Sequence, residues 1–125
     1  MKNNFIYIFI VLFLIGCDQS TDLYIDGACE SYGVSERKTP LGTFGGVYEL
    51  PDSEIQKVCG HTGWVNRQHA GCAILQDDGA VNIYYRNGDT CTLNHEKCHV
   101  MHGPFHTKQY IKDVANNHPR PSCPK

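Results

Sequence analysis

Six cysteines limit what this chain can fold into more than any other feature. The chain has 125 residues and seven cysteines, one of which, Cys17, lies in an N-terminal segment of a different kind. A domain of about 100 residues buries a modest core, and small exported domains commonly depend on disulfides. The sequence therefore predicts up to three disulfides, whose pairing it leaves open. The candidates are Cys29, Cys59, Cys72, Cys91, Cys98 and Cys123. A cysteine-ligated zinc site is the disfavoured alternative, because no C-x-x-C pair is present.

The N-terminus has the features of a bacterial export signal. Lys2 precedes an apolar run from residue 5 to residue 15, which suits a signal peptide and is short for a membrane-spanning helix. The run ends in Leu14-Ile15-Gly16-Cys17, which resembles the bacterial lipobox. This resemblance implies cleavage before Cys17 and lipid on that cysteine. The alternative is a plain N-terminal anchor helix with an incidental cysteine, and under either interpretation the rest of the chain is exported.

The lipobox divides the chain into three segments. Residues 1–16 are expected to be a lipoprotein signal peptide, residues 17–26 a lipidated tether, and residues 27–125 a single domain. In Gram-negative lipoproteins, an aspartate directly after the lipidated cysteine favours retention at the inner membrane, and Asp18 occupies that position. We therefore expect a lipid-anchored protein of the bacterial cell envelope, at the periplasmic face of the inner membrane.

Charge argues against nucleic acid as a partner. The formal net charge is −2 with neutral histidines, and the positive residues are scattered along the chain. Proteins that bind nucleic acid usually carry a basic patch or stripe.

The first half of the domain predicts little regular structure. Residues 29–46 are rich in Gly, Ser, Thr and Pro, and we expect a loop. Residues 47–50 suit a short strand, and residues 51–59 suit a short helix capped by Asp52 or Ser53.

The second half predicts a β-hairpin followed by helices. Residues 72–75 and 80–85 are apolar or alternating runs around the turn Asp77-Asp78-Gly79. A helix is expected from about residue 93 to about residue 102, capped by Thr92 or Asn94 and ended by Gly103-Pro104. A second short helix is expected over 106–116, followed by a coil over 117–125. The fold class is α+β: a small disulfide-stapled domain with an antiparallel hairpin packed on the helix.

That helix carries H-E-x-x-H, as His95-Glu96-Lys97-Cys98-His99. Residues four apart lie on one face of a helix, so the two imidazoles can bind one zinc ion. The glutamate beside the first histidine can act as general base toward water at the metal. A disulfide at Cys98 would clamp this helix to a strand or loop and give the site a rigid support.

The third ligand is predicted from the chain beyond the motif. His102 lies on the same helical face, but about 10 Å along the axis from His95, so three ligands on one straight helix converge poorly. His106 follows the Gly103-Pro104 break and can fold back. His106 is therefore the preferred third ligand and His102 the alternative, with a helix-capping or supporting role for His102 if it does not bind.

The stretch H-E-K-C-H-V-M-H-G-P-F-H resembles the active-site helix of zincin metallopeptidases. Among zincins, metzincins have H-E-x-x-H-x-x-G-x-x-H, and this chain has one extra residue before the glycine and no clear counterpart of their Met-turn. The resemblance implies a zincin-like fold with zinc, a glutamate base, and an edge strand along which a peptide lies. It also implies an oxyanion-stabilising tyrosine, for which Tyr110 is nearest in sequence and Tyr85 lies on the expected edge strand.

Two functions from different classes follow. The first is a zinc-dependent metallopeptidase of the cell envelope, in which Glu96 activates zinc-bound water and the partner is a peptide or protein substrate. The second is a non-catalytic envelope lipoprotein that binds metal or another protein. Three protein ligands plus a water would favour catalysis, and a closed four-ligand site that includes His102 would favour structure.

Overall fold

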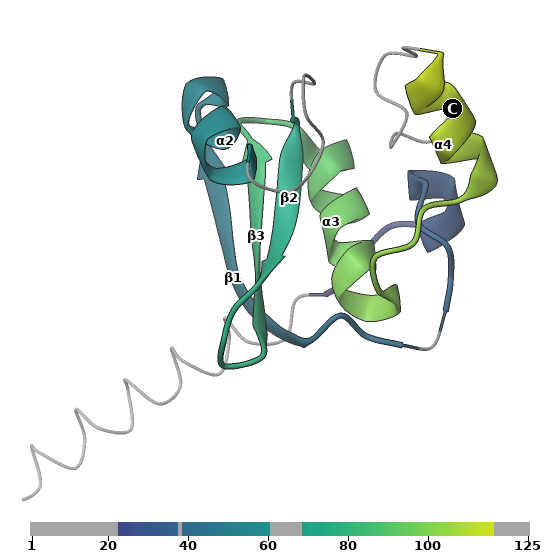
Figure 1. Ribbon diagram of the computed structural model, residues 1–125, viewed down its shortest axis with the longest axis horizontal. Coiled ribbons are helices and arrows are strands. Elements are labelled where there is room, and N and C mark those ends of the chain that lie inside the picture. The colour runs from purple at the N-terminus through teal and green to yellow at the C-terminus, as the bar shows by residue number, and fades with distance from the viewer. Residues whose placement is uncertain (1–22, 38, 61–68, 117–125) are drawn as a thin grey trace, which may run out of the picture.

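The computed structural model describes residues 23–37, 39–60 and 69–116, which form a small α+β domain (Figure 1). In chain order the elements are the 3₁₀ helix η1 (Cys29–Tyr32), strand β1 (Thr43–Leu50), helix α2 (Asp52–Cys59), strand β2 (Gly71–Leu75), strand β3 (Ala80–Arg86), helix α3 (Thr90–His102) and helix α4 (Lys108–Ala115). The expected signal peptide with Cys17, and the tail with Cys123, lie outside the described residues. Within the described ranges, no helix has the length and apolar character that a membrane span needs.

The three strands form one mixed sheet in the order β1-β3-β2. The expected hairpin is confirmed, because β2 pairs with β3 in antiparallel register from Gly71↔Tyr85 to Leu75↔Val81. The sheet is not purely antiparallel, since β1 lies parallel to β3 on its other side. The sequence did not predict this pairing, because a parallel neighbour is separated in the chain by a crossover and leaves no local signal.

Strand β1 begins at Thr43, so the expected loop over residues 29–46 is wrong at its end. The register shifts between Phe44 and Val47, and Gly46 N–H donates to Asn82 Oδ1 at 2.9 Å. A Cβ on Gly45 would lie 2.5 Å from the same Oδ1 and 3.0 Å from Val81 O. The two glycines therefore belong to a bulge that lets β1 approach β3, and they are not loop residues.

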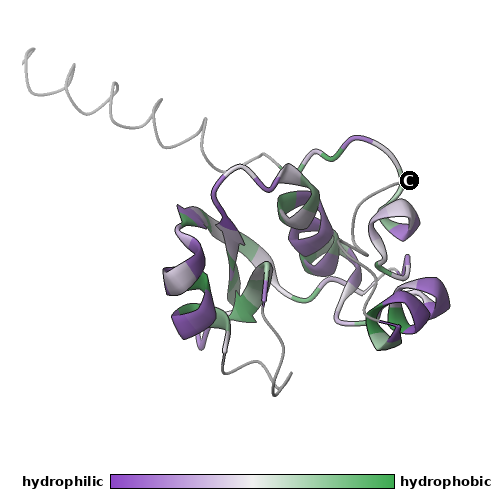
Figure 2. Ribbon diagram, turned by 90° about the horizontal axis from the view of Figure 1, so that it is seen from above, coloured by the Kyte–Doolittle hydropathy of each residue, from purple (hydrophilic) through white to green (hydrophobic). Residues whose placement is uncertain are grey.

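Each face of the sheet is covered by one helix (Figures 1 and 2). On one face, Ile55 and Cys59 of α2 pack with Cys72 of β2. On the other face, Val100 of α3 packs with Val81 and Ile83 of β3. Alternate residues of β2 and β3 thus point to opposite helices, as the two-residue period of a strand requires.

A further layer lies beyond α3, on its side away from the sheet, where Figure 1 shows η1 and α4. The buried residues of this layer are Cys29, Tyr32, Val34 and Cys98, with Ile25 and Met101 packed against them. Helix α3 is therefore enclosed on two sides, and every residue from His95 to Val100 is buried. This enclosure explains how a helix rich in polar residues comes to lie in the centre of the domain.

Disulfides link these layers, as the cysteine count predicted. Cys29 is bonded to Cys98, which ties η1 to α3, and Cys59 is bonded to Cys72, which ties α2 to β2. Cys91 is also disulfide-bonded. With sequence separations of 69 and 13 residues, loop-closure entropy gives the two described bonds about 4 and about 3 kcal/mol of stability.

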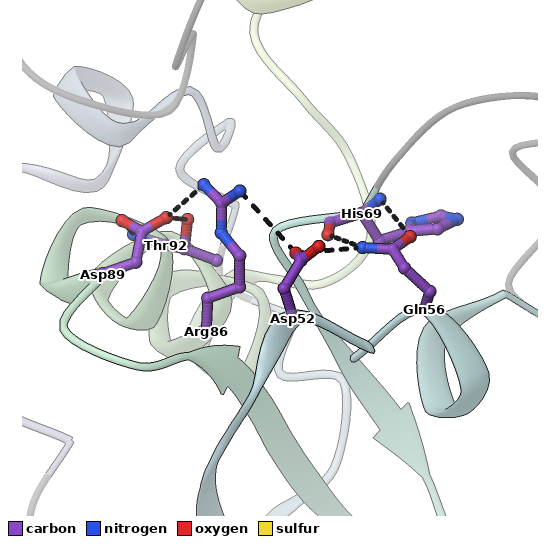
Figure 3. A network of polar contacts seen from close by, with 6 residues as sticks. All are labelled: Asp52, Gln56, His69, Arg86, Asp89 and Thr92. Carbon is purple, nitrogen blue, oxygen red and sulfur yellow. Dashed lines mark hydrogen bonds and ion pairs between the residues drawn. The ribbon is translucent and has the colours of Figure 1, made fainter. Parts of the chain in front are cut away.

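Helix α3 begins earlier than expected, and its cap is neither Thr92 nor Asn94. Asp89 is the N-cap, because its carboxylate accepts from Thr92 N at 3.2 Å and from Thr92 Oγ1 at 2.8 Å (Figure 3). Arg86 Nη2 lies 3.2 Å from the same carboxylate, and Arg86 Nη1 lies 3.8 Å from Asp52 of α2. The end of β3 is thereby joined to the starts of both helices. Helix α2 has Pro51 as its N-cap, not Asp52 or Ser53, and no side chain caps it.

The segment before β2 is joined to α2 by one side-chain amide (Figure 3). Gln56 Nε2 donates to His69 O at 2.6 Å, and His69 N donates to Gln56 Oε1 at 2.9 Å. The amide thus forms the same pair of bonds that a neighbouring strand would form.

Replacing Asp89 with alanine should destabilise the domain by about 1–2 kcal/mol, because α3 loses its cap and Arg86 loses its buried partner. Urea unfolding followed by circular dichroism measures this change. Asp77→Ala is the matched control, since Asp77 is exposed in the hairpin turn, and it should change stability by less than about 0.5 kcal/mol. Equal stabilities of the two variants would contradict the structural role of Asp89.

Candidate metal centre

Three histidines meet on the side of α3 that faces α4. His95 and His99 lie one turn apart on α3, and His106 lies in the segment before α4. The Nε2 atom of His99 is 3.1 Å from that of His95 and 3.1 Å from that of His106. The three ligand atoms all lie within 4.8 Å of one another, and such a group could hold a metal ion.

The Nδ1 atoms of His95 and His99, which point away from the cluster and are its outer nitrogens, form hydrogen bonds with backbone carbonyl groups. His95 Nδ1–H donates to Tyr32 O at 2.5 Å, and His99 Nδ1–H donates to Gly103 O at 2.9 Å. A carbonyl oxygen can only accept, so in the neutral imidazoles the proton is on Nδ1 and Nε2 carries a lone pair. Metal-binding histidines are commonly oriented by such a bond.

The inner nitrogens are arranged as a cation would require. With Nδ1 protonated, the lone pairs of two Nε2 atoms face one another across 3.1 Å, which is repulsive unless a positive charge lies between them. Zinc–nitrogen bonds of 2.0–2.1 Å in a tetrahedral site place neighbouring nitrogens about 3.3 Å apart. The residues present therefore fit a metal ion.

Backbone pairing brings His106 to the other two histidines. Val34 and His106 form an antiparallel bridge. On either side of it, Ser35 N–H donates to Phe105 O and Thr107 N–H donates to Gly33 O, each at 2.9 Å. The turn before it depends on Gly103, which has φ +94°, and a Cβ there would lie 2.9 Å from Thr39 O.

His102, the alternative third ligand, is outside the cluster. His102 is the last residue of α3, and its Nδ1–H donates to the backbone oxygen of Arg37 at 2.6 Å. The helix ends at Gly103 as expected, so the chain reverses before His106. The structure thus brings His106, and not His102, to His95 and His99.

Burial keeps the three imidazoles neutral. It lowers the pKa of His95 to about 3, with a further lowering by His99 and a partial opposing effect of the Tyr32 carbonyl. Burial and His99 lower the pKa of His106 to about 4, and burial also lowers the pKa of His99. Near neutral pH all three side chains are therefore in the form that binds metal.

Glu96 follows His95 in the sequence and is buried. Its neighbours in the helical projection are Thr92 and Val100, on the side of α3 that faces the sheet. Burial raises the pKa of its carboxyl group to about 8. A cation held by the adjacent His95 would favour the carboxylate form.

Tyr110 covers the histidines from α4. Its ring stacks on those of His106 and His95, with centroids 4.3 and 5.0 Å apart. The close contact of this ring with Gly33 leaves no room there for a Cβ. The oxyanion role of Tyr110 stays a prediction.

Tyr85 does not lie on an edge strand as expected. It belongs to β3, the central strand, and its hydroxyl donates to Glu49 Oε2 at 2.8 Å on the neighbouring β1. The edge strands are β1 and β2.

No family model matches this chain, and no curated protein or solved structure is significantly similar to it. The chemistry of the centre therefore follows from its own residues, and the zincin resemblance stays a prediction.

The metal-free protein should lose stability as the pH falls from about 6.5 to about 4. In this range His95 and His106 bind protons in the unfolded chain and not in the folded one, so each adds a slope of up to about 1.4 kcal/mol per pH unit. Glu96, whose raised pKa keeps it protonated in the folded state, opposes one such slope until the unfolded carboxyl group is also protonated. Urea midpoints in the presence of a chelator measure the slope. His106→Asn should flatten it and His102→Ala should not, and equal slopes in both variants would contradict the assignment.

Proposed function

We propose that this protein is a zinc-dependent metallopeptidase of the bacterial cell envelope. The observation that carries the proposal is the convergence of three imidazole Nε2 atoms that could hold a metal ion. Glu96, the next residue after His95 in the sequence, is buried in the same helix. Three protein ligands leave one position of a tetrahedral zinc ion for water or substrate, which is typical of catalytic sites. The resemblance of H-E-K-C-H to the zincin motif supports peptide hydrolysis as the reaction, on a zincin-like arrangement of helix and sheet.

Each residue has a distinct role in the proposed reaction. His95, His99 and His106 hold the metal, which when bound supplies Lewis acidity at water and at the scissile carbonyl group. Glu96 accepts a proton from the attacking water and passes it to the leaving amine nitrogen. Tyr110 is the candidate donor to the oxyanion, because its ring already lies against two of the histidines.

The proposed location follows from the N-terminal sequence. Lipid on Cys17 would anchor the domain to the membrane, and Asp18 favours the periplasmic face of the inner membrane. The disulfides support this location, because every described cysteine is disulfide-bonded and the periplasm is an oxidising compartment.

A non-catalytic metal holder is the second candidate. One observation favours it: His95 is 3% exposed and His99 is 7% exposed, and Tyr110 stacks on His95 and His106. Such cover would restrict a substrate more than it would restrict a metal ion. Under this function the protein binds metal and hydrolyses nothing.

Glu96→Gln distinguishes the two functions. Its amide is neutral and of similar size, so the fold and the metal should be retained. Hydrolysis should fall by about 10²–10⁴-fold, the usual contribution of a general base. Mass spectrometry of a peptide library incubated with the zinc-loaded mature protein measures cleavage.

Glu54→Gln is the control, since Glu54 is exposed on α2 and pairs with Lys57 at the surface. It should cleave as the wild type does. Undiminished cleavage by Glu96→Gln would contradict the base assignment, and no cleavage by the zinc-loaded wild type would favour the metal holder.

A further inference from the structure

The segment from Cys29 to Ser35 contacts both sides of the metal centre. Tyr32 O accepts the bond from His95 Nδ1, on the α3 side. Gly33 O and Ser35 N bond to the backbone on either side of His106, at Thr107 and Phe105. The position of this one segment therefore fixes the orientation of His95 and the location of His106.

Hydrogen bonds, a small buried cluster and one covalent bond hold the segment in place, and Asn94 Nδ2 of α3 donates to the Tyr32 hydroxyl at 3.2 Å. Its only regular element, η1, has four residues, and 3₁₀ turns of this length have no independent stability. Its buried cluster is small and includes both Cys29 and Cys98. The disulfide between these two cysteines joins η1 to α3 at the residue directly before His99.

We propose that the Cys29–Cys98 disulfide completes the metal centre, so that metal affinity depends on this bond and not on the H-E-x-x-H motif alone. The inference rests on the metal centre of the proposed function. Without the bond, the Tyr32 carbonyl no longer holds the Nδ1 tautomer of His95, and the bridge that presents His106 loses its support. A chain with both cysteines unpaired then offers the metal two histidines on a helix and binds it weakly.

The second described disulfide supplies a matched comparison. Cys59–Cys72 joins α2 to β2 on the opposite face of the sheet, where it packs with Ile55. The described bonds that orient His95, His99 and the backbone around His106 go to Tyr32, Gly103, Gly33 and Ser35, not to these two cysteines. Its removal should reduce stability without changing the metal site.

The test measures zinc affinity of the oxidised mature protein by competition with a chromophoric chelator. The double variant Cys29→Ala/Cys98→Ala should bind zinc at least about 100-fold more weakly than wild type, the upper range for loss of groups that orient ligands. The double variant Cys59→Ala/Cys72→Ala should stay within about twofold of wild type, as expected for a distant site. Circular dichroism of each sample shows whether the fold persists.

A pair of glycine variants tests the same contact with both disulfides intact. Gly33 and Gly79 have φ of +86° and +90°, so alanine strains the backbone similarly at both. At Gly33 the new Cβ would overlap the Tyr110 ring, whereas at Gly79 nothing lies within 4 Å. Gly33→Ala should therefore displace the segment and weaken zinc binding, and Gly79→Ala should not.

The outcomes separate this inference from the proposed function. Wild-type affinity in a folded Cys29→Ala/Cys98→Ala variant would overturn the inference and leave the metal centre intact. If that variant does not fold, equal zinc affinities of Gly33→Ala and Gly79→Ala would overturn it. A wild-type protein that binds no zinc would overturn both proposals.

Discussion

The bond from His95 Nδ1–H to the Tyr32 carbonyl is the contact on which the arrangement of the centre depends. It places the proton on the outer nitrogen and leaves the inner lone pair for a metal. The carbonyl stays in place because η1 is tied to α3 by Cys29–Cys98, and the residues after η1 pair with the backbone around His106. A short, irregular segment thus organises side chains that lie more than sixty residues away in sequence.

The centre combines groups that are unfavourable to bury without a metal. Two imidazoles have pKa values of about 3 and about 4, and the carboxyl group of Glu96 has a pKa of about 8. Burial therefore holds all of these groups in their neutral forms, and the lone pairs of the histidines face one another. A bound cation would relieve that repulsion and favour the carboxylate, so metal binding and folding should stabilise one another.

Local patterns predicted the parts of the fold that depend on local interactions. The Asp-Asp-Gly turn predicted the hairpin of β2 and β3, and Gly103 predicted the end of the motif helix. The start of β1 was missed because Gly45 and Gly46, which form a bulge, have the composition of a loop. Its parallel pairing was missed because a crossover separates the two strands in the chain. The start of α3 was missed because Asp89 stands in a turn-like Arg-Asn-Gly-Asp sequence.

In the candidate site, too, the sequence predicted what depends on local interactions and not the contacts made by distant backbone. The helical period places His95 and His99 together, and Cys98 within the motif indicated a clamp on the helix. The partner of Cys98, the bridge from Val34 to His106 and the two carbonyl acceptors come from distant backbone. The Gly103-Pro104 break already favoured His106 over His102, and the structure agrees. No side-chain pattern encodes a backbone carbonyl, so tertiary structure was needed to show which groups orient the ligands.

Zinc content of the purified oxidised mature protein, measured by elemental analysis after zinc loading and removal of unbound metal, tests the central claim most directly. The wild type and His102→Ala should each retain one zinc ion per chain, and His99→Ala should retain none while keeping its helical circular dichroism signal. Absence of zinc from the wild type, or equal retention by His99→Ala, would contradict a metal centre at His95, His99 and His106.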